Sequence, residues 1–213
     1  EPLGKSIKTS ISSTPTETCH DLIILTPLKE EWDELLAVLD TAIDTVVDPL
    51  SREYSYDFRI NSYRCRGAFI GEMGETESAL AVQRFVNLNP KLVVLLGIAG
   101  ALHPDVKLGD VVAADVVDSY LSRSKAVSSP RTKGRYELEL AGAPYRCSSA
   151  LLNEVQNLQY AHAGVFKEWQ SRTQTERARL MPDQGASLMQ TGAINPASRI
   201  HKGHMACGPI VAA

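Results

Sequence analysis

The sequence predicts an α/β fold, in which buried strands alternate with amphipathic helices. An apolar run, Leu92–Leu96, is typical of a strand buried on both faces. It ends in the small residues Gly97–Ala101, and a turn at Lys107–Asp110 leads to a second apolar run, Val111–Val117. Because open α/β sheets bind ligands where a buried strand ends in such a loop, we expect a site there.

The segment before this strand supplies the alternating elements. Leu22–Leu25 predicts a central strand, and Lys29–Leu39 predicts a helix. The apolar face of this helix is expected to be Trp32, Leu35, Leu36 and Leu39. Tyr54–Ile60 and Tyr63–Ile70 predict a hairpin, and a second helix is expected from about Glu75 to Leu88. The buried side of the second helix is expected to be Ala79, Leu80, Val82, Phe85 and Val86.

The second half of the chain has a weaker pattern. We interpret Ser122–Arg135 and Pro182–Ser198 as loops. Helices are expected at Ser148–Leu158, capped by Ser148 or Ser149, and at Val165–Leu180. A last strand is expected in the final part of Ile200–Ala213.

Composition limits the class of protein. The 213 residues suit one domain, 21–213, preceded by a polar segment, 1–20, that we interpret as a tail or a linker. A net charge of −3 does not favour nucleic acid as a partner, and no apolar run is long enough to cross a membrane. No signal peptide is visible, and four widely spaced cysteines favour free thiols in the cytoplasm. We expect no metal site, with His201 and His204 satisfied or facing solvent.

Three segments together resemble the nucleoside phosphorylase and nucleosidase superfamily. They are ILTPLKEEWDELL, GEMGETESALAVQRF and VVLLGIAGALHPDVKLGDVVAAD, and a weaker fourth is GPIVAA. The resemblance covers about residues 21–117 and 203–213 and is strongest to the methylthioadenosine/S-adenosylhomocysteine nucleosidases. It implies a three-layer αβα domain with a mixed, partly closed central sheet.

The resemblance also implies roles for individual residues. Glu31 matches the carboxylate that activates water, and Met73 and Gly74 match the 5′ side of the ribose site. Ala99 and Gly100 match the loop that contacts the base. Ile98 stands where many of these nucleosidases have a serine, so a polar contact is expected to be missing. The implied substrate is a purine nucleoside or nucleotide, and no cofactor is implied.

Three functions stay open. The first is an N-ribosyl hydrolase, and the second is a catalytically inactive nucleoside-binding, regulatory or oligomerisation domain. The third is a purine nucleoside phosphorylase, and the resemblance to that branch places Lys29 where its first phosphate-binding arginine stands. The second arginine would fall near Leu95 or Leu96, which are apolar. This substitution favours water as the nucleophile.

The resemblance also sets expectations about a larger protein. Its members continue past GPIVAA with a purine platform, a ribose clamp and an acid, so we expect about 80–100 further residues in the native polypeptide. Residues 122–202 resemble the long insert of nucleosidase-like effector domains fused to other modules in bacterial defence proteins. Their basic residues would suit a polyphosphate or a solvated loop, and they are Arg123, Lys125, Arg131, Lys133 and Arg135. Family members are usually homo-oligomers, which we expect here too.

Overall fold

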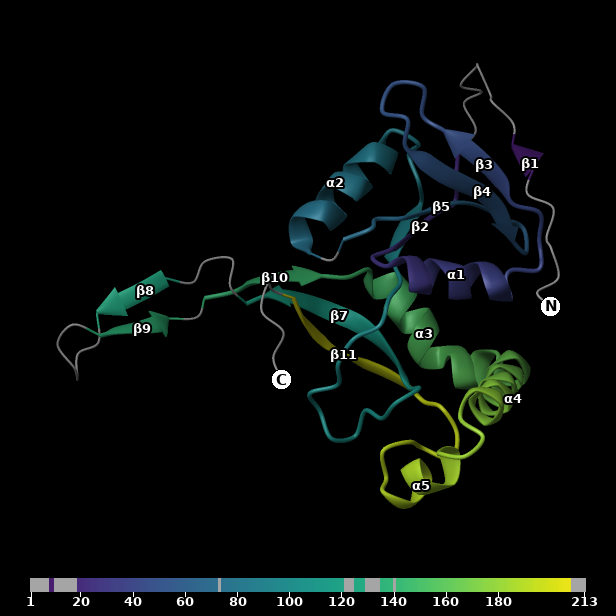
Figure 1. Ribbon diagram of the computed structural model, residues 1–213, viewed down its shortest axis with the longest axis vertical. Helices are drawn as coiled ribbons and strands as arrows, with labels where there is room; N and C mark the ends of the chain where they lie inside the picture. The colour runs from purple at the N-terminus through teal and green to yellow at the C-terminus, as the bar shows by residue number, and fades with distance from the viewer. Residues whose placement is uncertain are drawn as a thin grey trace. The chain divides into compact units, whose positions relative to one another are not determined.

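A computed structural model describes residues 8–9, 19–72, 74–120, 125–128, 135–139 and 141–207 (Figure 1). The chain divides into two compact units, residues 1–99 and residues 100–213. Each unit is described by itself.

The first unit contains a six-stranded mixed sheet with the strand order β1-β3-β4-β5-β2-β6. Its strands are β1 (Lys8–Thr9), β2 (Leu22–Thr26), β3 (Asp44–Val47), β4 (Tyr54–Ile60), β5 (Tyr63–Phe69) and β6 (Leu92–Leu95). The expected hairpin is β4–β5, and Asn61 closes it with a φ of 53°. Two short strands, β1 and β3, were not predicted; β1 lies within the predicted tail and pairs with β3.

The parallel strands of this sheet bring the loops of the candidate site together. β2 pairs in parallel with β5 on one side and with β6 on the other, so that Leu22 lies opposite both Cys65 and Leu92. The carboxyl ends of the three strands therefore meet at one edge of the sheet. Such an edge is where open α/β sheets place their ligand-binding loops.

Two helices cover opposite faces of the sheet, which gives this unit three layers (Figure 1). Helix α1 (Lys29–Val38) packs Trp32 and Leu35 against Ile24, Phe58 and Cys65. The predicted apolar face of α1 is confirmed, with Leu36 partly buried and Leu39 buried just after the helix. Helix α2 (Glu75–Val86) packs on the other face, against a cluster of Ile23, Leu25 and Ala68.

Two burial predictions for the first unit were wrong. Helix α2 buries Ala81 and Phe85, whereas the expected residues Ala79, Leu80, Val82 and Val86 are exposed. Only the side of the helix that carries Ala81 and Phe85, one turn apart, faces the sheet. Strand β6 is not buried on both faces, because Val93 and Leu95 expose one face, and Leu96 just after it is exposed as well. Among the described strands, β6 is at the edge of its sheet.

The second unit is built on β7 (Val111–Ser119), which lies between an antiparallel and a parallel neighbour. The antiparallel strand is β10 (Ala143–Arg146) and the parallel strand is β11 (Ile200–Cys207). Helix α3 (Ser149–Ala161) packs on β7 and β11, and the Oγ of Ser148 caps it by accepting from Leu151 N. Helix α4 (Ala163–Leu180) follows and packs on α3.

Two loop predictions for the second unit are corrected, and the prediction of a strand at the end of the sequence is not tested. The segment expected as a loop at 122–135 carries strand β8 (Lys125–Ser128), which pairs with β9 (Tyr136–Glu139). The second expected loop contains a short helix, α5 (Gly185–Gln190). The final strand, β11, begins at Ile200, and residues 208–213, where we expected it, lie outside the described residues.

The fold class is confirmed as mixed α/β, but the strands that the structure describes form three separate open sheets rather than a partly closed one. No helix within the described part of the chain has both the length and the apolar character to span a bilayer.

Candidate functional site

Three loops of the first unit meet where β2, β5 and β6 end. After β5, Ile70 N donates to Thr26 O at 2.8 Å and Gly71 N donates to Pro27 O at 3.0 Å. After β6, Leu96 N donates to Leu25 O at 2.9 Å. These main-chain bonds hold the segments that follow β5 and β6 against the end of β2, and Gly71 against Pro27 just after it.

Glu31 lies where these loops meet, and two main-chain N–H groups hold its carboxylate. Leu28 N donates to Oε2 at 2.9 Å, and Ile98 N donates to Oε1 at 2.8 Å. The first bond caps α1, because Leu28 is the N-cap residue and Glu31 the third helical residue. The second joins α1 to the loop after β6, across 67 positions of sequence. Glu31 is half-buried, whereas the neighbouring Glu30 is exposed.

Gly97 leaves the space that this carboxylate occupies. A methyl group at residue 97 would lie 3.0 Å from Glu31 Oε1 and 3.3 Å from Pro27 Cδ. Contacts this short are tighter than ordinary van der Waals contacts. Any larger residue here would require the Glu31 carboxylate to shift by a few tenths of an ångström.

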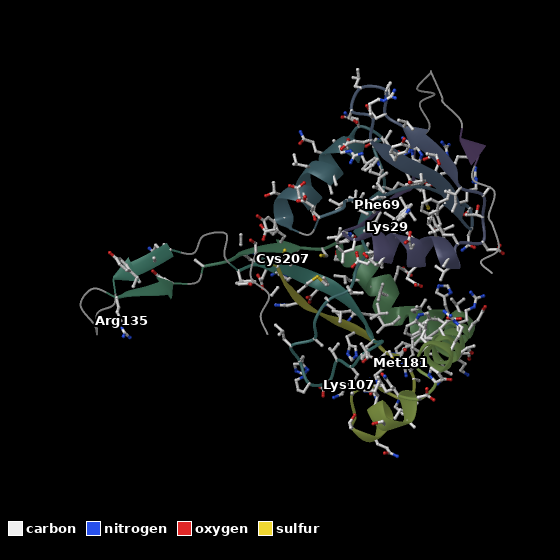
Figure 2. The ribbon with its side chains drawn as sticks, viewed as in Figure 1. Lys29, Phe69, Lys107, Arg135, Met181 and Cys207 are labelled. Carbon is white, nitrogen blue, oxygen red and sulfur yellow. The ribbon has the colours of Figure 1, made fainter. Side chains whose placement is uncertain are left out.

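Lys29 is engaged elsewhere. Lys29 is labelled in Figure 2, and its ammonium group forms an ion pair with Asp33, one turn further along α1. Both side chains are largely exposed. Lys29 is the residue that stands in place of a phosphate-binding arginine in the phosphorylase comparison, and its charge is already partnered.

The remaining residues expected in the site are less closely tied to Glu31. Ile98 contributes its N–H while its side chain is 82% exposed, so the contact does not depend on a serine side chain. Ala99 is exposed and follows directly in the same loop. Gly74 has a φ of 136° and begins α2, and nothing lies within 4 Å of the place a methyl group would take. Gly100 belongs to the second unit, and Met73 lies outside the described residues.

Sequence reasoning missed Leu28 and Gly97. A capping box is normally visible as Ser or Thr three residues before Glu. Here the N-cap is Leu28, which contributes only its main chain, so no side-chain signal marks it. Gly97 stood in the expected loop, but the sequence does not show which side chain would lie against it.

The second unit contains the other groups singled out in the sequence. His201 Nε2 donates to the buried Asp110 Oδ2 at 3.0 Å. The His204 side chain is 67% exposed and lies 3.7 Å from Asp115 and 3.8 Å from Asp118.

Two members of the basic set are described. Lys125 pairs with Glu139 at 3.6 Å, and Arg135 lies exposed where the chain enters β9 (Figure 2). Arg123, Arg131 and Lys133 lie outside the described residues.

A family model described as the phosphorylase superfamily matches residues 21–189, and the chain therefore belongs to that superfamily. This match includes Glu31 and the loop after β6. No curated protein matches the chain in sequence.

Solved structures of nucleosidases share the fold at low sequence identity. The 5′-methylthioadenosine/S-adenosylhomocysteine nucleosidase of Campylobacter jejuni is 14% identical with a TM-score of 0.51, over 91% of this chain and 66% of that one. The nucleosidase of Neisseria meningitidis, solved in complex with methylthio-immucillin-A, is 15% identical with a TM-score of 0.53, over 88% and 64%. Futalosine hydrolase of Helicobacter pylori is 12% identical with a TM-score of 0.57, over 92% and 69%. The chain thus spans less than two thirds of the length of the two nucleosidases.

Proposed function

We propose that this chain carries the water-activating half of a purine N-ribosyl hydrolase, with Glu31 as the general base. The observation that carries the proposal is the fixed carboxylate of Glu31 at the carboxyl ends of three parallel strands. Membership of the phosphorylase superfamily and the fold shared with solved nucleosidases support it.

The geometry suits a base that must hold a water in one place. Each carboxylate oxygen has two lone-pair directions, and each accepts one main-chain N–H here. Each oxygen therefore keeps capacity for a further donor, such as a water molecule. Because both bonds come from main chain, rotation of the carboxylate is restricted before any substrate arrives.

The reaction follows from this placement. The water oxygen forms a bond to the anomeric carbon of the ribose while the N-glycosidic bond breaks. The bonding electrons leave with the purine, and Glu31 takes the proton that the attacking water loses. The purine anion takes one proton from water and Glu31 later returns its proton to solvent, so the products are the neutral free base and the ribose with its 5′ substituent. Ala99, a small and exposed residue of the same loop, is proposed to lie against the flat base.

Two observations favour water over phosphate as the nucleophile. The ammonium group of Lys29 is paired with Asp33. Leu95 and Leu96, where a phosphate-binding arginine would be expected, are exposed apolar residues. Phosphate oxyanions are held by arginine forks and lysine charges. Leu95 and Leu96 supply neither, and Lys29 would have to leave Asp33 to bind a phosphate.

The finer parts of the proposal concern the native protein. We propose a purine nucleoside or nucleotide as substrate, a cytoplasmic location and a homo-oligomeric assembly. We also propose that the domain is the effector part of a multidomain defence protein. The complex of the Neisseria nucleosidase with methylthio-immucillin-A supports the nucleoside class of ligand.

The test is purine release by the full native polypeptide, measured with methylthioadenosine, adenosine, inosine, AMP and ATP, with and without phosphate. Glu31→Gln keeps the size of the side chain but cannot take a proton, and we expect it to slow base release by about 10²–10⁴-fold. Glu30→Gln is the matched control, because Glu30 is the exposed neighbour.

The outcomes separate the three functions. Release without phosphate that is lost only in Glu31→Gln would support the hydrolase. Release that requires phosphate would assign the chain to the phosphorylases. Binding without release from any substrate would refute the hydrolase and leave a regulatory domain.

A further inference from the structure

The second unit contains a cleft that shares no residue with the Glu31 site. It lies between helices α3 and α4 and the paired strands β7 and β11, and its volume is about 450 Å³. This volume is within the range of small-molecule sites, about 300–1,000 Å³. All its lining residues belong to residues 100–213.

One side of the cleft is apolar. Leu152 and Val155 of α3 line it together with Phe166 of α4. Leu152 is buried, whereas Val155 and Phe166 are half-buried, so both present accessible apolar surface. The Phe166 ring is held by Trp169, with ring centroids 5.5 Å apart. Such a wall suits an apolar or flat ligand body.

The opposite edge is basic. Arg199, His201 and Lys202 line it where the chain enters β11. The Arg199 guanidinium makes no hydrogen bond or ion pair with any residue that the structure describes, although Arg199 N donates to Asp110. Lys202 has one acidic neighbour, Asp115, at 3.7 Å.

The nearby carboxylate of Asp110 is held by donors from the protein and does not point into the cleft as a free acceptor. Its side chain is fully buried, and it accepts from Lys107 N, Arg199 N, Asn195 Nδ2 and His201 Nε2. No acidic residue is among the described residues that line the cleft. The charged side chains that line the cleft are therefore cations, and Arg199, which has no ionic partner among the described residues, favours an anion.

Three amide side chains complete the lining: Gln156, Gln159 and Gln170. Gln170 Nε2 donates to Ser198 O at 3.0 Å, which fixes one of them. Amides beside two cations provide neutral hydrogen bonds that help to hold a phosphoryl group.

We propose that this cleft is a second ligand site, which binds a small molecule that joins an apolar or aromatic body to a phosphate group. Arg199 and Lys202 bind the phosphate, and Val155 and Phe166 contact the body. The proposal is independent of the function assigned to Glu31.

The test is isothermal titration calorimetry of the full chain with phenyl phosphate, which offers both parts of the expected ligand. Phenol and inorganic phosphate are the matched probes for each part alone. We expect saturable binding of one phenyl phosphate per chain, with phenol and phosphate each at least about tenfold weaker. Glu31→Gln should leave this binding unchanged.

Arg199→Ala should weaken phenyl phosphate binding by about tenfold or more, because it removes a charge-assisted hydrogen bond. Arg179→Ala is the control, since Arg179 is an exposed cation of α4 that pairs with Glu176 outside the cleft. Val155→Phe fills the cleft without changing charge and should also weaken binding. Thermal melts of each variant check the fold.

Three results would overturn the proposal. They are no binding of phenyl phosphate, full affinity in Arg199→Ala, and an equal loss of affinity in Arg179→Ala.

Discussion

Gly97→Ala tests whether the orientation of Glu31 is used in catalysis. The added methyl group would lie 3.0 Å from Glu31 Oε1, 3.3 Å from Glu31 Cδ and 3.3 Å from Pro27 Cδ. Gly97 is not among the residues with a positive φ, so the substitution imposes no backbone strain and its effect is steric. The carboxylate must move by a few tenths of an ångström to restore ordinary contacts. That movement loosens the 2.8 Å bond from Ile98 N.

The magnitude follows from the precision that catalysis needs. A misplacement of about 1 Å costs on the order of 100-fold in rate. A shift of roughly a third of that size should therefore lower the rate of base release by about 3- to 10-fold. The added methyl group of Gly97→Ala also overpacks an exposed loop, which should lower the free energy of unfolding by about 1 kcal/mol.

The assay is the purine-release rate at saturating substrate, with a thermal melt of the same preparation. Gly164→Ala is the control, because nothing lies within 4 Å of the place its methyl group would take, at the start of α4. That control should keep full activity. An unchanged rate in Gly97→Ala with an unchanged melting temperature would refute the role of the Glu31 orientation.

Three further predictions concern stability. Burial opposes ionisation of Asp57, but hydrogen bonds from Arg66 and His20 outweigh it and lower its pKa from 3.8 to about 2. Because its pKa is lower in the folded state, ionised Asp57 stabilises the fold above pH 3.8, and this stabilisation is lost as the pH falls towards 2. Asp57→Asn should therefore cost about 2 kcal/mol of unfolding free energy at pH 7 and less in acid, as measured by urea unfolding. A cost that stays constant with pH would contradict this. Ser148→Ala should lose about 1 kcal/mol of unfolding free energy through the α3 cap, whereas Ser149→Ala should lose less; equal losses would contradict the assignment of the cap. Asp110→Ala leaves four donors without their acceptor and should lower unfolding free energy by at least about 3 kcal/mol, and a loss under 1 kcal/mol would contradict its role.

The regular elements of the first unit could be predicted because local pattern determines them. The apolar run of β2 and the helical spacing of Trp32 and Leu35 both give periodic signals, and the structure confirms them. The hairpin β4–β5 was equally clear, since a short polar turn separates two alternating runs. Its turn residue, Asn61, accepts the positive φ that the turn requires.

Weak local signals account for the errors in the second unit. Strands β8 and β9 have four residues each, and α5 has six, so none of them gives a clear period. The sequence did not decide whether Ser148 or Ser149 caps α3, because both precede the same apolar run. Only the bond from Leu151 N to Ser148 Oγ decides between them.

The sequence by itself determined the type of most helices and longer strands, the loop after β6 and the choice of Glu31 as the candidate base. The elements follow from periodicity and turn residues, which are local, whereas the choice of Glu31 follows from the resemblance of ILTPLKEEWDELL to the nucleosidases. Only the tertiary structure decided that β6 is an edge strand and that Ile98 N and Leu28 N hold Glu31. It also decided that Gly97 leaves room for the carboxylate. The physical reason is that main-chain donors and empty space carry no side-chain signature, so they become visible only when distant segments pack together.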